Sequence, residues 1–239
     1  IYEQRRHPVS AEKISKPMKQ AIVAIEDRRF YEHEGVDFQG NFRALWSNLA
    51  SGGVSQGAST LNQQYVKNYL LLVNAKTEEE RAAAIEQSVP RKLREMRMAT
   101  DLDKKLDKEE ILSNYLNLVP FGNHAYGVEA AARTYFGTHA SELTVPQAAM
   151  LAGMVQSSEY LNPFTNKDEV LSRRNLVLQS MADSGSITQA EADKYAQQDL
   201  GVLDKPSLLP NGCISAKDRG FFCDYVIEYL EEKGISREQ

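Results

Sequence analysis

The stretch Glu26–Gly35 has the sequence EDRRFYEHEG and follows the largely apolar run PMKQAIVAI at residues 17–25. A proline in the first turn and a glycine at the end are helix-boundary signals, so we expect one helix to span both segments. At helical spacing the residues that share a face with Glu26 are Ile22, Arg29 and His33. An acid with apolar and basic neighbours can transfer protons, although half of a structural ion pair is its commoner role.

A second motif, QGASTLNQQYVKN at residues 56–68, leads from small residues into a polar helix face. Ser59 or Thr60 can cap this helix, with Asn62 or Gln63 returning the hydrogen bond. The polar side chains that follow at helical spacing are Thr60, Gln63, Gln64, Lys67 and Asn68. Amides and one ammonium group would suit an anionic ligand, whereas a solvated helix face explains the same stretch equally well.

A third motif, RKLREMR at residues 91–97, follows the helix-start signals Ser88 and Pro90. Its basic residues surround Glu95, and an ordinary ion-pair network on a surface helix would account for them locally. A carboxylate among cations stays ionised, whereas one against apolar side chains is protonated more readily, so Glu26 and Glu95 would differ in role. Two carboxyl groups in different surroundings are typical of sugar chemistry.

The three motifs together resemble the family 51 glycosyltransferase domain of bacterial class A penicillin-binding proteins, the peptidoglycan transglycosylase. Further motifs follow in the same order: KEEILSNYLN at residues 108–117, QAAMLAG at 147–153 and RRN at 173–175. Ordered motifs over about residues 10–200 are far more specific than any one short pattern. The resemblance implies a mainly α fold with a lysozyme-like helical core and a smaller jaw lobe.

The family's activity would be polymerisation of lipid II into β-1,4 glycan strands, with inversion and release of undecaprenyl pyrophosphate. The resemblance implies that Glu26 is the catalytic base and that Lys67, Arg91 and Lys92 stabilise the pyrophosphate. Glu95 would orient these cations or help to hold a divalent ion. The residues implied to position phosphates and sugars are Ser59, Thr60, Gln63, Gln64, Asn68 and Gln156.

The sequence requires no cofactor, although Mg²⁺ or Mn²⁺ could accompany the pyrophosphate. The implied partners are lipid II, the growing lipid-linked glycan, the membrane surface and moenomycin as an inhibitor. We expect a location at the extracytoplasmic face of the bacterial membrane, with an N-terminal membrane helix outside this sequence. Residues 1–200 would form the glycosyltransferase domain, and residues 201–239 would be a linker towards a transpeptidase domain.

Composition agrees with this interpretation. The net charge of −5 and the pI of about 5.5 speak against nucleic-acid binding, which favours a basic surplus. The 4 His and 2 Cys show no zinc-binding spacing, and we see no apolar run of membrane-spanning length. An oxidising location would favour a Cys213–Cys223 disulfide, with two free thiols as the alternative.

Capping signals predict helices that start near Asp37, Asp107, Thr144, Asn166 and Thr188, with one strand near residues 1–6. The helix after Asp37 would carry the apolar stripe Phe38, Phe42, Leu45, Trp46 and Leu49. This stripe and residues 69–73 are the expected membrane-facing surfaces near the mouth of the site.

Two features depart from the family pattern. The stretch between Lys67 and Arg91 is longer than usual, and Met154-Val155 replaces a Leu-Pro pair, which bears on the role of Gln156. Two other functions stay open. A lytic peptidoglycan hydrolase would also use two acids on a lysozyme-like fold, and a non-catalytic module could bind lipid-linked glycans.

Overall fold

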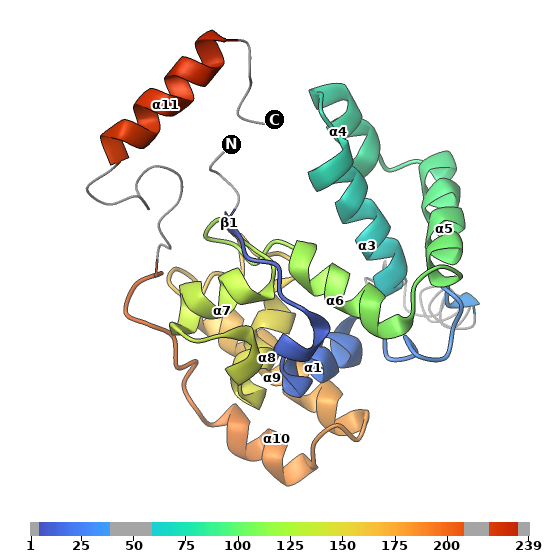
Figure 1. Cartoon of the computed structure of the whole chain (residues 1–239). Helices are drawn as coiled ribbons and strands as arrows, with labels where there is room; N and C mark the ends of the chain where they lie inside the picture. Colours follow the sequence, from blue (N-terminus) through green and yellow to red (C-terminus); the bar gives the residue numbers. More distant parts are fainter. Residues whose placement is uncertain (1–4, 39–58, 208–219, 234–239) are drawn as a thin grey trace.

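The structure is a computed structural model that describes residues 5–38, 59–207 and 220–233. The described ranges are mainly helical, with one two-residue strand near the start of the chain (Figure 1) and a second in its middle. Strand β1 (Arg5–Arg6) pairs in parallel with β2 (Ala125–Tyr126), Arg5 opposite Ala125. This confirms the strand expected near the N-terminus.

The larger lobe is built around α8 (Val145–Met154), which packs against α1 (Lys16–Glu26) and α9 (Lys167–Asp183). The elements that complete this lobe are η1 (Ala11–Lys13), α6 (Lys108–Leu118), α7 (Val128–Phe136), η3 (Ala140–Glu142) and α10 (Gln189–Ala196). Small side chains of α8 permit the close approach, and a Cβ added at Gly153 would lie 3.0 Å from the Arg173 side chain. The core therefore sets α9 tightly against α8.

The smaller lobe lies to one side of this core and consists of α3, α4 and α5 with a π-helical turn (Figure 1). Its bounds are α3 (Leu61–Tyr69), η2 (Leu70–Asn74), α4 (Glu78–Ile85) and α5 (Val89–Asp103). The long segment between Lys67 and Arg91 is thus resolved into η2 and α4. The expected mainly α fold with a smaller second lobe is confirmed.

Several helix starts are confirmed by their side-chain caps. Asp107 and Glu110 form a reciprocal capping box at α6, and Thr188 and Glu191 form another at α10. Ser88 accepts a hydrogen bond from the backbone of Arg91 at α5. Asn166 precedes α9 as expected, but its amide donates to the Tyr160 carbonyl instead of capping the helix.

The prediction that one helix continues from residue 17 to Gly35 is wrong, because α1 ends at Glu26. Asp27 leaves the helix with φ of −158°, and its carboxylate binds the backbone of Leu61 and the ring of His33. Gly35 serves a different purpose from a helix stop. Its φ is +87°, and a Cβ there would lie 2.5 Å from the Ala99 carbonyl oxygen, so only glycine fits this approach.

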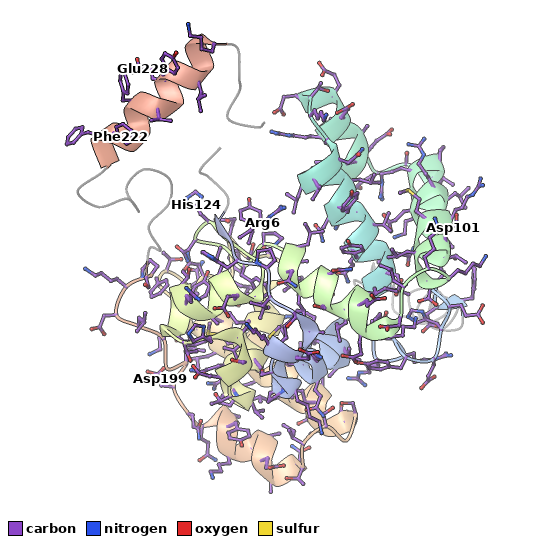
Figure 2. The ribbon with its side chains drawn as sticks, viewed as in Figure 1. Arg6, Asp101, His124, Asp199, Phe222 and Glu228 are labelled. Carbon is purple, nitrogen blue, oxygen red and sulfur yellow. The ribbon has the colours of Figure 1, made fainter. Side chains whose placement is uncertain are left out.

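Residues 203 and 207 still bind the core, through backbone hydrogen bonds to the carbonyls of Tyr135 and Thr134. Helix α11 (Gly220–Glu232) lies apart from both lobes (Figure 1), with Phe222 and Glu228 projecting from it (Figure 2). The predicted Cys213–Cys223 disulfide and most of the apolar stripe after Asp37 fall outside what the structure describes. In the described ranges, we find no helix with the length and hydropathy to span a bilayer.

Arg174 on α9 is fully buried and anchors the end of α10. Its guanidinium donates to the carbonyls of Ala196 (3.0 Å), Gln198 (2.8 Å) and Asp199 (3.1 Å). We expect Arg174→Met to lower the free energy of unfolding by about 3 kcal/mol, because several buried carbonyls lose their donor.

Urea unfolding followed by circular dichroism measures this loss. Lys167→Met, also on α9, is the matched control, since Lys167 forms an exposed ion pair with the Asp199 side chain. Equal stability of the two variants would contradict the anchoring role of Arg174.

Candidate functional site

The carboxylate of Glu26 lies at the end of α1, where elements from three parts of the chain meet. Its side chain is 13% exposed. Its Oε2 accepts a hydrogen bond of 2.8 Å from Nε2 of Gln64 on α3, and its Oε1 lies 4.0 Å from the guanidinium of Arg173 on α9. The structure therefore brings Glu26 and Gln64 together and adds a cation from α9.

Tyr115 on α6 fixes the orientation of the Gln64 amide. The buried phenol donates a hydrogen bond of 2.9 Å to Oε1 of Gln64, so the amide NH₂ must face Glu26. Burial and the nearby charge of Glu26 raise the pKa of Tyr115 well above its ordinary value. Tyr115 consequently remains a hydrogen-bond donor at neutral pH and holds the Gln64–Glu26 contact in one arrangement.

The basic partner of Glu26 differs from the one that helical spacing predicted. Arg29 pairs with Glu32 at 3.0 Å, and His33 binds Asp27 at 2.9 Å. Both lie beyond the end of α1, so neither shares a helix face with Glu26. Arg173 takes that place, and its Nε donates to the Gly153 carbonyl at 3.3 Å. Burial lowers the pKa of Arg173 and the charge of Glu26 raises it, with a net decrease.

Sequence reasoning missed Tyr115 and Arg173 as site residues. Both stand in motifs that carry the family resemblance, but Tyr115 fits the apolar pattern of its helix, and the RRN motif by itself gives Arg173 no role. A phenol on an otherwise apolar helix face was the available signal, because a buried hydroxyl needs a partner.

The second carboxylate, Glu95 on α5, is held by cations of its own helix. Its side chain is 4% exposed. Oε2 lies 2.5 Å from the Arg91 guanidinium, and Oε1 contacts the Lys92 ammonium. Lys92 also donates to the hydroxyl of Ser59 at 2.7 Å. Glu95 thus orients two cations, and Lys92 connects α5 to the residues just before α3.

A cavity of about 180 Å³ opens beside this carboxylate. Its charged lining consists of Lys67, Arg91, Arg94, Glu80 and Glu95, so that three basic side chains face two acidic ones. We call Lys67, Arg91, Lys92 and Glu95 the cation cluster. Such a surplus of positive charge around a cavity suits an anionic group.

Helix α3 connects the two carboxylate centres. Gln64 contacts Glu26, and Lys67, three residues further on, borders the cation-cluster cavity. Three residues correspond to about 4.5 Å along a helix axis, and residues at this spacing lie on one side of it. One short helix therefore presents a hydrogen-bond donor to the first carboxylate and a lysine to the cavity beside the second.

Thr60 and Gln63 are buried at the start of α3 instead of lining an open surface. They form a reciprocal capping box, and the Thr60 hydroxyl donates to the Gly35 carbonyl at 2.7 Å. Asn68 is half-buried further along the same helix. Gln156 is exposed and borders a separate cavity of about 570 Å³ together with Arg173. This cavity reaches the neighbourhood of Glu26 through Arg173.

The donor set at Glu95 does not fit a metal held by the protein. Mg²⁺ and Mn²⁺ favour carboxylate oxygens, and both oxygens of Glu95 already contact cations. Across the part of the chain that the structure describes, no group of three or more His, Cys, Asp or Glu residues is placed to hold an ion. We therefore derive no chemical step through a metal.

The side chains around the smaller lobe show which of its faces is open. Asp101 projects from α5 away from the core (Figure 2). Of residues 69–73, Tyr69 at the end of α3 and Val73 in η2 are exposed, whereas residues 70–72 are half-buried. Phe38 is exposed as well, while the rest of its predicted stripe is not described.

Comparison with known proteins agrees with the geometry. The family described as Transglycosylase matches residues 1–182. Penicillin-binding protein 1A of Escherichia coli K12 is 42% identical over 235 residues, which cover 98% of this chain and 25% of that protein. Penicillin-binding protein 1A of Haemophilus influenzae Rd is 39% identical over 241 residues, 99% of this chain and 25% of the relative. Penicillin-binding protein 1A/1B of Bacillus subtilis 168 is 37% identical over 234 residues, which cover 96% of this chain and 24% of that protein.

The chain thus spans about a quarter of the length of these relatives. A crystal structure of penicillin-binding protein 1A from Haemophilus influenzae matches 85% of this chain and 19% of the solved one, with a TM-score of 0.50. Its aligned sequence identity of 23% makes this a likeness of fold alone.

Proposed function

Because the chain belongs to the transglycosylase family and carries its peptidoglycan glycosyltransferase domain, we propose that it polymerises lipid II into β-1,4 glycan strands. The reaction proceeds with inversion and releases undecaprenyl pyrophosphate. The observation that carries this proposal is the joint placement of Gln64 and Lys67 on α3, which sets one carboxylate beside a separate cationic cavity. The transfer needs both features, because a base must take a proton from the acceptor sugar and cations must stabilise the pyrophosphate that leaves the donor sugar.

In this proposal the Glu26 carboxylate accepts the proton of the acceptor 4-hydroxyl as that oxygen attacks the anomeric carbon. The contact to Gln64 orients the carboxylate, and Tyr115 holds Gln64 in turn. General-base catalysis of this kind typically contributes about 10²- to 10⁴-fold to the rate. The bond to the pyrophosphate oxygen breaks as the new glycosidic bond forms, and the configuration inverts.

The leaving pyrophosphate gains negative charge, which Lys67, Arg91 and Lys92 would stabilise. Glu95 holds two of these cations before the reaction starts, so little reorganisation is needed. Ser59, Gln64 and Asn68 would contribute hydrogen bonds to phosphates and sugar, and Gln156 would contact the glycan near Arg173. The buried pair Thr60 and Gln63 would act by fixing the start of α3.

The cation cluster also discriminates between the candidate functions. A lytic hydrolase would act on a neutral glycan backbone and would not require three cations beside a carboxylate. A non-catalytic binding module would not require the oriented Glu26 carboxylate. The geometry therefore favours a transferase that uses a pyrophosphate-linked donor.

The remaining partners are part of the same proposal. The chain would work at the extracytoplasmic membrane surface, next to the lipid tail of its substrate, and the exposed Tyr69 and Val73 are suited to that surface. In a full-length protein it would be joined to an N-terminal membrane helix and a transpeptidase domain. Any Mg²⁺ or Mn²⁺ would be held mainly by the pyrophosphate. Moenomycin would compete for the cation cluster through its phosphoglycerate.

Incubation of the protein with purified lipid II tests the proposal. We expect glycan polymer on a gel, and we expect moenomycin to suppress it. Finished peptidoglycan serves as the contrasting substrate, because only a hydrolase would release fragments from it. Fragment release without polymer would replace the transferase by the hydrolase, and binding of lipid II without turnover would favour the non-catalytic module.

A further inference from the structure

A polar junction, buried at Asp27, His33 and Asn62, lies where the stretch after α1, the start of α3, the end of α5 and the start of α6 meet. Its members are Asp27, His33, Asn62, Asp103 and Lys108. We propose that this junction sets the position of α3, and that Asp27 is a positioning residue which acts on the reaction through Gln64. The inference rests on the proposed function for its kinetic part and on the contacts below for its structural part.

Asp27 connects the residue next to Glu26 with the first turn of α3. One carboxylate oxygen, Oδ2, accepts hydrogen bonds of 2.9 Å from both the Leu61 backbone and Nε2 of His33. The side chains of Asp27 and His33 are each 4% exposed. The first N–H groups of a helix lack partners within it and favour an anion, so Asp27 both satisfies and anchors the start of α3.

The other side of the junction is held by Lys108 at the start of α6. Its ammonium group donates to the His33 carbonyl and to Asp103, each at 2.6 Å, and lies 4.9 Å from the centre of the Phe30 ring. Asp103 also accepts a hydrogen bond of 2.9 Å from the side-chain amide of Asn62. The path of contacts thus runs from α1 through α6 and α5 back to the first turn of α3.

The smaller lobe depends on such directional contacts because its own apolar core is small. Its separate apolar cluster has Val36, Val66 and Ala99 as its buried members, and every residue of α4 is exposed or half-buried. Apolar contacts are non-directional, whereas hydrogen bonds in a buried network fix one geometry. The junction therefore determines where along α3 Gln64 meets Glu26.

Loss of the Asp27 carboxylate is expected to move α3 without removing any group that touches substrate. Misplacement by about 1 Å can reduce a rate by about a hundredfold, so we expect Asp27→Ala to lower kcat about tenfold to a hundredfold. Asp27→Asn should recover much of this loss, since the amide oxygen can still accept from Leu61 and His33. Arg174→Met is the control for general destabilisation, because Arg174 anchors the end of α10 and its hydrogen bonds go to residues outside the junction.

A double-mutant cycle separates positioning from a purely structural role. Gln64→Leu alone should lower kcat, and the double variant Asp27→Ala with Gln64→Leu should be little slower than the slower single variant. Effects that multiply, or a kcat loss in Arg174→Met equal to that in Asp27→Ala, would overturn the proposal. If Asp27→Ala does not fold, Lys108→Met takes its place in the cycle, because it removes the contacts of Lys108 with His33 and Asp103.

Amide hydrogen exchange provides a test that does not depend on turnover. We expect faster exchange at residues 61–67 in Asp27→Ala than in the wild type, and near wild-type exchange there in Asp27→Asn and in Arg174→Met. Unchanged exchange in Asp27→Ala would overturn the junction itself. If the exchange differences are observed but the wild-type protein does not polymerise lipid II, the junction stands and the proposed function is wrong.

Discussion

Replacement of Glu26 by glutamine is expected to abolish polymerisation of lipid II while leaving the fold intact. The amide oxygen can still accept the hydrogen bond from Gln64, so the local arrangement survives. An amide cannot accept the proton of the acceptor hydroxyl, and we therefore expect a rate loss of about 10²- to 10⁴-fold. Polymer formation from lipid II, quantified on gels over time, measures the loss.

Two checks accompany this variant. Circular dichroism and binding of moenomycin should match the wild type, because the cation cluster is untouched. Glu109→Gln is the matched control, since Glu109 is a half-exposed carboxylate that pairs with Lys19 away from Gln64. Near-normal turnover by Glu26→Gln would remove Glu26 from the role of base.

Replacement of Arg91 by alanine is expected to reduce turnover about 10²- to 10³-fold, as for the loss of one preorganised donor at a developing negative charge. The change also leaves the buried Glu95 with Lys92 as its remaining cation in the cluster. Moenomycin binding should weaken in parallel. Arg91→Lys should restore only part of both properties, because a lysine lacks the planar fork that pairs with phosphate.

Lys67→Ala should behave like Arg91→Ala, since both side chains border the same cavity. Arg81→Ala on α4 is the control, because Arg81 forms an exposed ion pair with Glu78. Normal inhibitor binding by either cluster variant would place the pyrophosphate elsewhere on the protein.

Local signals predicted the framework of this protein well. Capping boxes at Asp107 and Thr188 lie where the sequence indicated, because a cap depends on residues three positions apart. The exception is the stretch after Glu26. Helical spacing continued to Gly35 in the sequence, but contacts from Asp27 to α3 and from Gly35 to α5 draw that stretch out of the helix.

The candidate site was predictable only in part, for the same reason. The contacts of Glu95 with Arg91 and Lys92 are local to one helix and followed from their spacing. Arg173 reaches Glu26 only because α9 packs tightly against α8, and no local pattern encodes that approach. Tyr115 likewise gained its role from the tertiary contact between α6 and α3.

Because Gln64 and Lys67 lie on one helix, α3 fixes the distance and the angle between these two side chains. A helix turns by about 100° per residue, so two residues inserted between them would turn Lys67 by about 200°, away from its cavity, while Gln64 stayed at Glu26. The protein should therefore tolerate substitutions between Gln64 and Lys67 far better than insertions or deletions there. In the proposed reaction, this interval would also fix the separation between the proton acceptor and the anion site, and a donor sugar would have to fit that separation.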